Sequence, residues 1–590
     1  SNNIGLQIGN EVCFDKGKVA NEFNNFLTTV ASTLVNKLPS PSGLFNQAKV
    51  EQYYADKGVE QNSFKLNSVG EEEVSKLLQS INTNKATGLD NLPAKFIKDG
   101  APVICPAFTH IINLSFHHGE LPRDLKSARV VPLYKKNSKT EAGNYRPVSI
   151  LCVLSKVVER LVYNQLENYL TTHSLFYEFQ SGFRSAFSTE SCLVHLTDYI
   201  RKQSDSGNYT GMVLLDLQKA FDTVDHSILL YKLKAVGADS LTCKWFEAYL
   251  TNRTQVTDVG GCFSSINQIT CGVPQGSILG PLLFLIYVND MASAINCKLL
   301  LYADDSALLV SGKDPELIQQ TLSAELANVS TWLVDNKLSL HLGKTESILF
   351  GSKRKLKKFS KLTIVCNDVN IESKTSVKYL GVDLDQSLSG EVIGCKVIKK
   401  VNSRLKFLYR KGKYFNTYCK KLLASALIQC HMDYACASWY SGLTKTTKSR
   451  LQICQNKVIR CILSLDSRSH IGYNEFNILN WLPVNYRVDQ LKLNHVFKVL
   501  HDTGPVYLKE GFVLNSELHN HYTRGSELTF FKPQVSTQGL KTFTFTAILA
   551  WNSLPLYIRE LDRYSNFKFK VKQWFLQKVK QNEENVFYYY

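Results

Sequence analysis

The stretch LLLYADDSALLV, from Leu299 to Val310, places two adjacent carboxylates inside an apolar run. Two short apolar segments around a polar centre predict a β-hairpin with Asp304 and Asp305 at its tip. Burying a carboxylate without a partner is costly, so the pair needs a turn, a cation or another partner. Aspartate is common in polar turns, and the tetrapeptide YADD by itself fits a plain hairpin turn as well.

A second predicted strand helps to decide whether Asp304 and Asp305 form a plain turn or need a cation. The stretch TGMVLLDL, residues 210–217, is apolar on both faces, which predicts a strand buried in a sheet, with Asp216 where the strand emerges. Three acids at two strand ends can meet at one sheet edge, where they would repel one another unless cations hold them. Mg²⁺ prefers oxygen ligands, and two metal ions about 3.5–4 Å apart can clamp an in-line phosphoryl displacement.

The composition is that of a globular protein with a polyanionic partner. The 590 residues are 44% hydrophobic and 20% charged, with a net charge of +18. This surplus favours nucleic acid as the partner, although a basic protein without one has the same composition. The 15 cysteines have no zinc-site spacing and are expected to be reduced thiols of an intracellular protein. No apolar run is long enough to cross a bilayer, so no membrane association is expected.

Periodicity and turn residues predict the order of the elements. We expect helices at 18–38, 71–81 and 94–99, a linker at 39–65, and a strand at 128–136 that ends in two lysines. The stretch NYRPVSILCVLSKVVERLVYNQLENYL (144–170) is expected to be a turn followed by a long helix. A capped helix should begin near Asp225 and end before Gly237, and a Gly/Pro loop should feed a helix with Pro281 near its first turn. From about 392 to 500 the pattern is helical and basic.

Nine blocks in a fixed order resemble the reverse transcriptases of non-LTR retrotransposons (LINE-like, jockey/CR1-type), over roughly residues 75 to 390. The blocks are NKATGLDNLP, VVPLYKK, NYRPVSIL, QSGFRSAFST, LLDLQKAFDTVDH, GVPQGSILGPLLFLIYVND, LYADD, NKLSLHLGKTESILF and VKYLGV. The flanking segments WYSGLTKTTKSRLQICQNKVIR and WNSLPLYIRE also look like those of such elements. This ordering favours a functional reading of YADD over a plain turn.

The resemblance implies an α+β fold of the right-hand polymerase type. Residues 71–390 would form fingers and palm, with an antiparallel sheet that carries the active site. Residues 391–500 would be a helical thumb and its extension, and residues 1–70 a helical N-terminal extension and linker. Residues 501–590, whose periodicity is weak, receive no role.

By the same resemblance, Asp216 and Asp304 would each bind two Mg²⁺ ions, for which Mn²⁺ is a possible substitute. Asp305 would support the site less directly, and the backbone carbonyl of Leu217 would add an oxygen ligand. Lys344, in GKTE, would protonate the leaving pyrophosphate as a general acid. A surface lysine in a turn is the alternative for Lys344.

Phe221 matches the family's aromatic gate, which blocks a 2′-hydroxyl and so selects dNTPs. Gln275 would contact the sugar of the dNTP or the template base, and Gly276 would permit close backbone approach. The alternative for Phe221 is an aromatic residue of the core. The alternative for Gln275 and Gly276 is an ordinary Pro-Gly loop.

Arg146 in NYRP and Lys135 or Lys136 in LYKK match basic residues that meet the triphosphate, with a solvated basic loop as the alternative. Asp222 and Asp225 are assigned to turn and helix-cap roles and not to metal binding.

Two further sets would contact nucleic acid, although an edge strand and a structural turn are serious alternatives for them. The set that would hold the 3′ end of the primer is Tyr379, Leu380 and Gly381. The set that would shape the template path is Gly182, Phe183 and Arg184. Basic residues of the helical region would track the template–primer duplex.

The expected function is RNA-templated DNA synthesis by two-metal phosphoryl transfer, with an RNA template, a DNA primer or target and dNTPs as partners. Such elements act in the nucleus, and KRKLKK at 353–358 is a candidate nuclear signal. No endonuclease pattern precedes residue 60, so we expect the endonuclease to be encoded upstream. The alternatives are a decayed copy that only binds nucleic acid and a group II intron maturase-like polymerase. An RNA-dependent RNA polymerase conflicts with Phe221.

Overall fold

The computed structural model describes residues 4–39, 45–518 and 528–587. They divide into two compact units. Unit 1 contains the chain up to Tyr177 together with Asp216–Asn296 and Glu325–Leu342. Unit 2 contains Glu178–Leu215, Cys297–Ala324 and the chain from Gly343 onward. The two units are therefore interleaved in sequence, and each is described by itself.

Unit 2 is built on a six-stranded sheet with the strand order β10-β11-β5-β13-β15-β14. Strand β11 is antiparallel to both β10 and β5, β13 is antiparallel to β5, and the β13–β15 pair is parallel. The strands are β5 (Tyr209–Leu215), β10 (Lys298–Tyr302), β11 (Asp305–Gly312), β13 (Glu346–Phe350), β14 (Ile364–Cys366) and β15 (Val369–Ser373). A separate hairpin joins β16 (Ser376–Tyr379) to β17 (Val382–Asp385).

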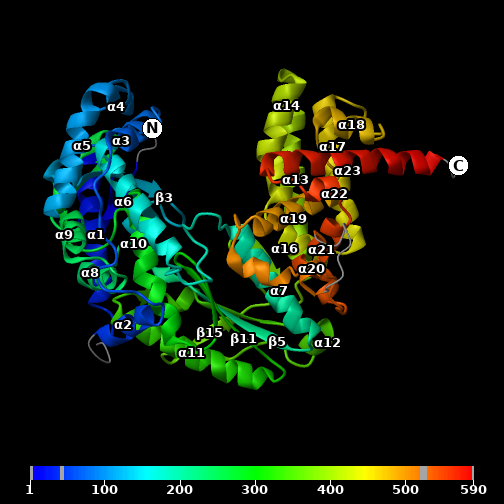
Figure 1. Cartoon of the computed structure of the whole chain (residues 1–590), viewed down its shortest axis with the longest axis horizontal. Coiled ribbons are helices and arrows are strands. Elements are labelled where there is room, and N and C mark those ends of the chain that lie inside the picture. Colours follow the sequence, from blue (N-terminus) through cyan, green and yellow to red (C-terminus); the bar gives the residue numbers. More distant parts are fainter. Residues whose placement is uncertain (1–3, 40–44, 519–527, 588–590) are drawn as a thin grey trace. The chain divides into compact units, whose positions relative to one another are not determined.

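Strand β5 is central and buried on both faces, as its apolar sequence predicts. Helix α7 (Thr189–Asp205) packs on one face, and the first part of α11 (Pro315–Asp335) lies against the other (Figure 1). A Cβ on Gly211 would lie 2.6 Å from the side chains of Ile318 and Leu322. The glycine thus lets α11 approach the strand closely, and the sheet is held rigidly between helices.

The rest of unit 2 is helical. Its hydrophobic core is continuous from the sheet to the C-terminal helices, since Met212 and Leu300 belong to the same cluster as Trp551 and Phe567. The helices are α12 (Lys353–Leu356), α13 (Glu391–Lys411), α14 (Thr417–Ala424), α15 (Cys430–Asp433), α16 (Cys436–Trp439), α17 (Lys445–Leu463), α18 (Tyr473–Leu479), α19 (Val484–Leu500), α20 (Asn515–Leu518), α21 (Phe543–Asn552), α22 (Leu556–Arg559) and α23 (Tyr564–Phe587).

Unit 1 carries a five-stranded sheet with the order β4-β3-β7-β8, in which β9 also pairs with β7. The strands of unit 1 are β1 (Leu6–Ile8), β2 (Glu11–Cys13), β3 (Ser127–Tyr134), β4 (Tyr145–Leu151), β6 (Leu217–Gln218), β7 (Arg253–Val259), β8 (Cys262–Phe263), β9 (Asn267–Ile269) and β12 (Ser339–Leu340). The helices are α1 (Lys16–Val35), α2 (Gln47–Ala55), α3 (Glu71–Gln79), α4 (Ala94–Asp99), α5 (Ala101–His118), α6 (Val153–Thr172), α8 (His226–Ala235), α9 (Ser240–Leu250) and α10 (Leu279–Val288).

Local signals explain helix α8. Asp225 is its N-cap, and the carboxylate accepts a hydrogen bond from the Ile228 N–H at 3.0 Å. Gly237 follows the helix with φ of 109°, a conformation that favours glycine. Both predictions for this helix are confirmed.

Two sequence-based predictions were wrong. Residues 39–65 were expected to be a linker, but they contain α2, which buries Val50 and Tyr54 on one face. A single buried pair in a polar nine-residue helix gives little periodicity. Residues 144–170 were expected to be a turn and then a long helix, but Tyr145–Leu151 form β4, with alternating burial, before the helix α6. Strand β4 contains Pro147, and proline is tolerated there because β4 is at the edge of its sheet.

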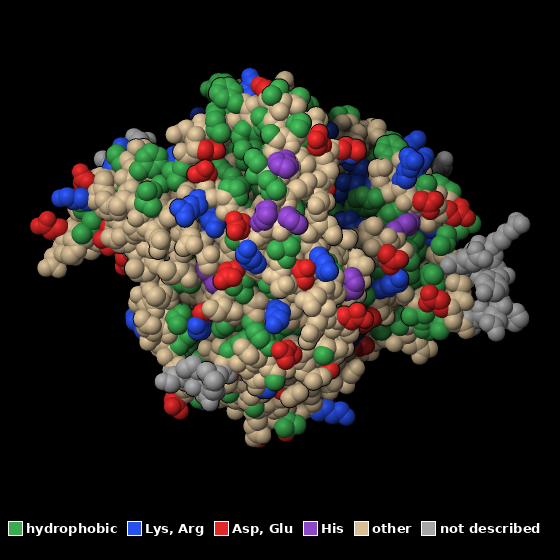
Figure 2. Space-filling view, turned by 60° about the vertical axis from the view of Figure 1, so that its left-hand side comes forward, with side chains coloured by type: hydrophobic (Ala, Val, Ile, Leu, Met, Phe, Trp, Pro, Cys, Tyr) green, Lys and Arg blue, Asp and Glu red, His purple; other side chains and the backbone are tan. Residues whose placement is uncertain are grey.

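The surface carries mixed charge. Figure 2 shows Lys and Arg side chains interspersed with Asp and Glu on the face that it draws. The positive surplus is therefore not gathered into one continuous field on this face. Among the helices of the described ranges, none combines the length and the apolar character needed to span a membrane.

Candidate active site

The YADD hairpin exposes its acids at the tip of a buried pair of strands. Tyr302 pairs with Asp305, so Ala303 and Asp304 form the turn between β10 and β11. Ala303 is buried and has φ of 57°, whereas Asp304 and Asp305 are exposed. The apolar flanks are the two strands, and the carboxylates therefore avoid the cost of burial.

Gln180 holds this turn from the adjacent segment of unit 2. Its Oε1 accepts hydrogen bonds from the Ala303 N–H at 3.0 Å and from the Gly182 N–H at 2.8 Å. Backbone bonds from the Ser181 N–H to the Leu301 carbonyl and from the Leu301 N–H to the Phe179 carbonyl run alongside. Gln180 is 1% exposed, so water does not compete for these bonds.

Gly182 lies against the same turn. A Cβ at Gly182 would clash with the backbone nitrogen of Ala303, so this position needs glycine. Phe183 is exposed with φ of 54°, and the Arg184 guanidinium lies 4.0 Å from the ring centroid of Phe187. Gly182, the first of the proposed template-path residues, thus adjoins the YADD turn. Gln180 was missed, although it opens the block QSGFR.

Tyr507, from the segment without an expected role, supports the same region. Its hydroxyl contacts the Ser181 Oγ at 3.0 Å and donates to the Ser191 Oγ at 3.2 Å. The ring lies 4.7 Å from that of His195, which stacks on Phe179. No sequence pattern pointed to Tyr507, because its partners lie more than 300 residues away.

Strand β5 ends next to this hairpin. Leu215 pairs with Ser306, and Asp216 is the next residue in the chain. The side chain of Asp216 is half-buried, and its carbonyl accepts a hydrogen bond from the His341 N–H at 2.8 Å. Leu217 follows in β6, opposite Leu340 of β12. Asp216 and Leu217 belong to unit 1, whereas Asp304 and Asp305 belong to unit 2.

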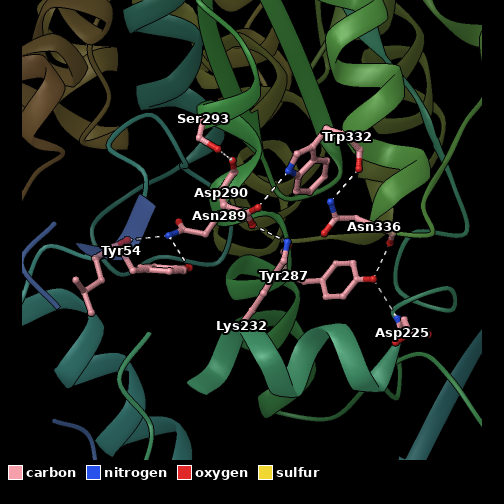
Figure 3. A network of polar contacts seen from close by, with 10 residues as sticks. Tyr54, Asp225, Lys232, Tyr287, Asn289, Asp290, Ser293, Trp332 and Asn336 are labelled. Carbon is pink, nitrogen blue, oxygen red and sulfur yellow. Dashed lines mark hydrogen bonds and ion pairs between the residues drawn. The ribbon is translucent and has the colours of Figure 1, made fainter. Parts of the chain in front are cut away.

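A buried polar network in unit 1 supports the segment around His341 (Figure 3). The Tyr287 hydroxyl donates to the Asn336 carbonyl at 2.6 Å and accepts from the Asp225 N–H at 3.3 Å. These bonds connect α10, the cap of α8 and the chain that leads into β12. Lys337 pairs with the Asp225 carboxylate at 2.5 Å.

At the centre of the network is a fully buried ion pair. The Lys232 Nζ lies 2.6 Å from Asp290 Oδ1, and the Trp332 indole donates to Asp290 Oδ2 at 3.1 Å (Figure 3). The ammonium also lies 4.7 Å from the Trp332 ring centroid. Burial lowers the pKa of Lys232, and Asp290 acts in the opposite direction. Removing either partner would leave a buried charge unpaired.

Gln275 and Arg146, two of the proposed dNTP-binding residues of unit 1, act on the carboxylate of Asp222. Gln275 Nε2 donates to Asp222 Oδ1 at 2.8 Å. Burial raises the pKa of Asp222, while Gln275, Lys219 and Arg146 act to lower it. Asp222 Oδ2 is buried and has no hydrogen-bond partner among the described residues. Asp222 therefore orients Gln275, a role that the turn assignment missed.

Basic residues border this cluster. Burial lowers the pKa of Lys219, and the charges of Lys135 and Arg146 add to that effect. Leu133 pairs with Arg146 across β3 and β4, and the Lys135 N–H bonds to the Asn144 carbonyl at 2.9 Å. Lys135, Lys136 and Arg146 are exposed at this end of the hairpin. The arrangement is an exposed cationic site suited to a polyphosphate.

Phe221 and Gly276 adjoin the Asp222–Gln275 pair in the chain, since Phe221 precedes Asp222 and Gly276 follows Gln275. The Phe221 ring stacks on Phe284 of α10, with centroids 4.5 Å apart, and its carbonyl accepts from the Val273 N–H. Gly276 has φ of 128°, and a Cβ there would clash with the Ser149 carbonyl. The loop thus requires glycine at this position, and it holds Phe221 near Gln275.

The remaining candidates lie in unit 2. Lys344 is exposed in a turn before β13. Leu380 and Gly381 form the β16–β17 turn with φ of 44° and 84°, and the Tyr434 hydroxyl donates to the Leu380 carbonyl at 2.6 Å. Tyr379 is only 3% exposed, and burial raises its pKa well above the usual value. Its ring is therefore a core group, and the turn is the exposed part of this hairpin.

The donor set suits a hard divalent cation, since Asp304 and Asp305 present exposed carboxylate oxygens on a rigid turn. Within the described ranges there is no cluster of three or more His, Cys, Asp or Glu residues able to hold a metal.

Residues 134–384 match the family model described as reverse transcriptase (RNA-dependent DNA polymerase). This range, less than half of the chain, is therefore similar to a reverse transcriptase domain. All candidate site residues, from Lys135 to Gly381, lie inside the matched range. The resemblance drawn from the nine ordered blocks is therefore confirmed.

Curated relatives of the domain are transposon polymerases. The chain is 27% identical over 457 residues to the probable RNA-directed DNA polymerase from transposon BS of Drosophila melanogaster, covering 73% of this chain and 49% of that protein. It is 27% identical to the RNA-directed DNA polymerase from mobile element jockey of the same species, covering 68% and 44%. The jockey polymerase of Drosophila funebris is 30% identical, covering 54% and 35%. The chain spans about half the length of these relatives or less.

Proposed function

We propose that this chain is the RNA-directed DNA polymerase of a non-LTR retrotransposon, extending a primer 3′-hydroxyl with dNTPs on an RNA template. The observation that carries the proposal is the exposed Asp304 at the tip of a rigid hairpin, inside the reverse transcriptase match. The strand beside that hairpin ends at Leu215, opposite Ser306, and Asp216 follows directly.

Asp216, Asp304 and the Leu217 carbonyl are the proposed ligands of two Mg²⁺ ions, with Asp305 in support and Mn²⁺ as a substitute. Bound there, the metal would supply charge stabilisation for phosphoryl transfer and lower the pKa of the attacking hydroxyl. The support is the ligand chemistry, because exposed carboxylates on rigid turns are suitable ligands for hard cations.

In the proposed reaction the primer 3′-oxygen bonds to the α-phosphorus of the dNTP, the α–β bridging bond breaks, and pyrophosphate leaves. Arg146, Lys135 and Lys136 would hold the triphosphate as exposed cations. Lys344, exposed in its turn, would give a proton to the leaving group.

Selection of dNTPs would rest on Phe221. Its stacking on Phe284 keeps the ring fixed, and a fixed ring excludes a 2′-hydroxyl more effectively than a mobile one. Gln275, oriented by Asp222, would contact the nucleotide, and Gly276 would let the backbone come close.

In the terms of a right-hand polymerase, the sheet of unit 2 corresponds to the palm, the β3–β4 hairpin to the fingers, and the helices from α13 to the thumb. Leu380 and Gly381, with Tyr379 behind them, would contact the primer end. Gly182, Phe183 and Arg184 would border the template. Action on chromosomal DNA would place the protein in the nucleus, with residues 353–358 as the candidate signal.

A primer-extension assay tests the proposal. The purified chain should extend a DNA primer on an RNA template with Mg²⁺ and dNTPs, and NTPs should support much less extension. Phe221→Ala should reduce the difference in extension between dNTPs and NTPs. Phe221→Tyr, which keeps an aromatic ring, should leave that difference unchanged. The absence of extension with either nucleotide would leave only a nucleic-acid-binding protein. Equal use of both by the wild type would contradict the role of Phe221.

A further inference from the structure

A pocket of about 430 Å³ lies among the C-terminal helices of unit 2, away from the hairpin tip in sequence. Residues of α14, α15, α17, α18, α19 and α23 line it, together with the π-helical turn Ser425–Gln429 and the loop before α19. Figure 1 shows α14, α18, α19 and α23 gathered in one helical group. None of the expectations for the catalytic site uses this pocket.

The acidic side chain in the lining, Asp433, is fully engaged. Its Oδ2 accepts from Arg487 Nε at 3.2 Å and Nη2 at 2.8 Å, and its Oδ1 accepts from Gln429 Nε2 at 2.8 Å. The charges of Asp433 and Arg487 therefore offset each other.

Two lysines add positive charge without such a partner. Lys421 and Lys572 line the pocket from α14 and α23, and among the described residues neither ammonium group has an ion-pair or hydrogen-bond partner. Lys572 is half-buried. Burial lowers the pKa of Lys572 to about 8, and Arg487, Lys421 and Lys568 act in the same direction. Cations held together without a counter-ion are stabilised by a bound anion.

The other lining groups suit a nucleotide. Trp481 is half-buried at the pocket, and an aromatic ring beside a cationic groove is the usual means of binding single strands. Ser425 and Gln429 come from the π-helical turn, a distortion that is frequent at functional sites. The volume suits one small ligand and is too small for a duplex.

We propose that this pocket binds one unpaired nucleotide of a single-stranded nucleic acid, with its phosphate between Lys421 and Lys572 and its base against Trp481. The inference rests on the proposed function, since a template strand is unpaired before it is copied. It assigns a second contact point for that strand, formed by helices α14 and α23.

Binding of a fluorescent 12-nucleotide single-stranded RNA to the full chain, followed by anisotropy at several salt concentrations, tests the inference. Lys572→Gln and Lys421→Gln should each weaken binding about 5- to 10-fold and reduce the salt slope by about 1. Trp481→Leu should weaken binding by a similar factor without changing the slope. Lys578→Gln is the matched control, because Lys578 is on the same helix but contacts Trp574 instead.

If Lys578→Gln and Lys572→Gln lose the same amount of RNA affinity, RNA binding depends on diffuse surface charge, and the inference is overturned. Equal losses on a 12-base-pair duplex would overturn its restriction to single strands. Amine labelling of the wild-type chain at pH 8 avoids any folding defect of the variants. The RNA should slow acetylation of Lys572 relative to Lys578, and protection by inorganic phosphate but not by RNA would also overturn the inference.

The outcome is separable from that of the polymerase assay. Lys572→Gln should raise the template–primer concentration needed for half-maximal extension, whereas the control Lys578→Gln should not. Weaker RNA binding by Lys572→Gln in a chain that extends no primer would support the pocket and reject the polymerase. Primer extension by the wild type, together with unchanged RNA binding by all the variants, would support the polymerase and reject the pocket.

Discussion

At the scale of single residues, Gln180 is the group that fixes the position of Asp304. Its Oε1 accepts hydrogen bonds from Ala303 and Gly182 in a site closed to water. Ala303 has a left-handed conformation that costs about 1 kcal/mol or more, so the turn needs this support.

Gln180→Met keeps the size of the side chain and removes the acceptor. We expect the single-turnover rate of primer extension to fall about 10- to 100-fold, with the affinity for template–primer little changed, because two buried N–H groups lose their partner. Rapid-quench kinetics at saturating dNTP measures the rate. Gln61→Met, at an exposed glutamine, is the control. A wild-type rate in Gln180→Met would show that the turn holds its shape alone.

Asp222 acts on the nucleotide site through Gln275. Asp222→Ala removes the acceptor of the Gln275 amide and should raise the KM for dNTP about 10-fold, since hydrogen bonds to charged groups contribute about 1.5–3 kcal/mol. Asp222→Asn retains an acceptor oxygen and should raise the KM less. Steady-state kinetics with each variant measures this. Identical effects of the two substitutions would indicate that the charge, and not the hydrogen bond, matters.

The sequence identified the exposed acids and the glycines, but not the residues that hold them in position. YADD and PQG are contiguous motifs, and Gly276 and Gly182 fill positions where a Cβ would clash. Gln180 and Asp222 act through partners 123 and 53 residues away, respectively, and such pairings follow only from the fold.

At the scale of elements, helix α7 connects the sheet to the C-terminal helices. His195 on α7 stacks on Phe179 and contacts Tyr507, and its Nε2 is buried without a hydrogen-bond partner among the described residues. Burial lowers the pKa of His195 to about 3, with Lys298 and Lys202 adding to the effect.

This shift makes the stability of unit 2 depend on pH. The unfolded chain binds a proton at His195 below about pH 6.5, whereas the folded chain does so only below about 3. The free energy of unfolding should therefore fall as the pH drops from 6.5, by about 2 kcal/mol at pH 5 from this group alone. Urea unfolding of the wild type and of His195→Phe measures it. A pH dependence that is the same in both chains would contradict the assignment.

Elements with strong local signals were predicted, and those that depend on a neighbour were not. The hairpin of β10 and β11, the buried strand β5 and the cap of α8 all follow from short-range patterns. Strand β4 and helix α2 do not, because pairing with β3 makes Tyr145–Leu151 a strand, and α2 owes its packing to two side chains.

At the scale of the whole molecule, the C-terminal segment is part of the core of unit 2. The Asp198 carboxylate of α7 accepts hydrogen bonds from the Phe543 and Thr544 N–H groups, at the start of α21. Asp205 accepts from the Gly539 N–H at 2.9 Å. Trp551 lies in the same cluster as Met212 of β5.

Truncation before residue 501 should therefore destabilise the sheet that carries Asp304, and not merely remove an appendage. We expect the truncated chain to lose the cooperative thermal transition of unit 2, because large buried groups such as Trp551 each contribute about 3–5 kcal/mol. Calorimetry of both chains measures this. An unchanged transition in the truncated chain would mean that residues 501–590 fold separately.

The interleaving of the two units along the chain could not be predicted from the sequence. Linear ranges for fingers, palm and thumb remain a prediction, because the chain passes between units within single motifs, such as between Leu215 and Asp216. A family resemblance orders the motifs along the chain, whereas the units depend on long-range contacts.

The most direct test of the central claim is the rate of primer extension in Asp304→Asn. The substitution keeps the size of the side chain and removes its charge, so the rate with Mg²⁺ should fall by at least about a hundredfold. Asp368→Asn is the control, since Asp368 is another exposed aspartate in a hairpin turn of the same sheet, between β14 and β15. That variant should extend the primer at the wild-type rate. Extension by Asp304→Asn at the wild-type rate would contradict the account.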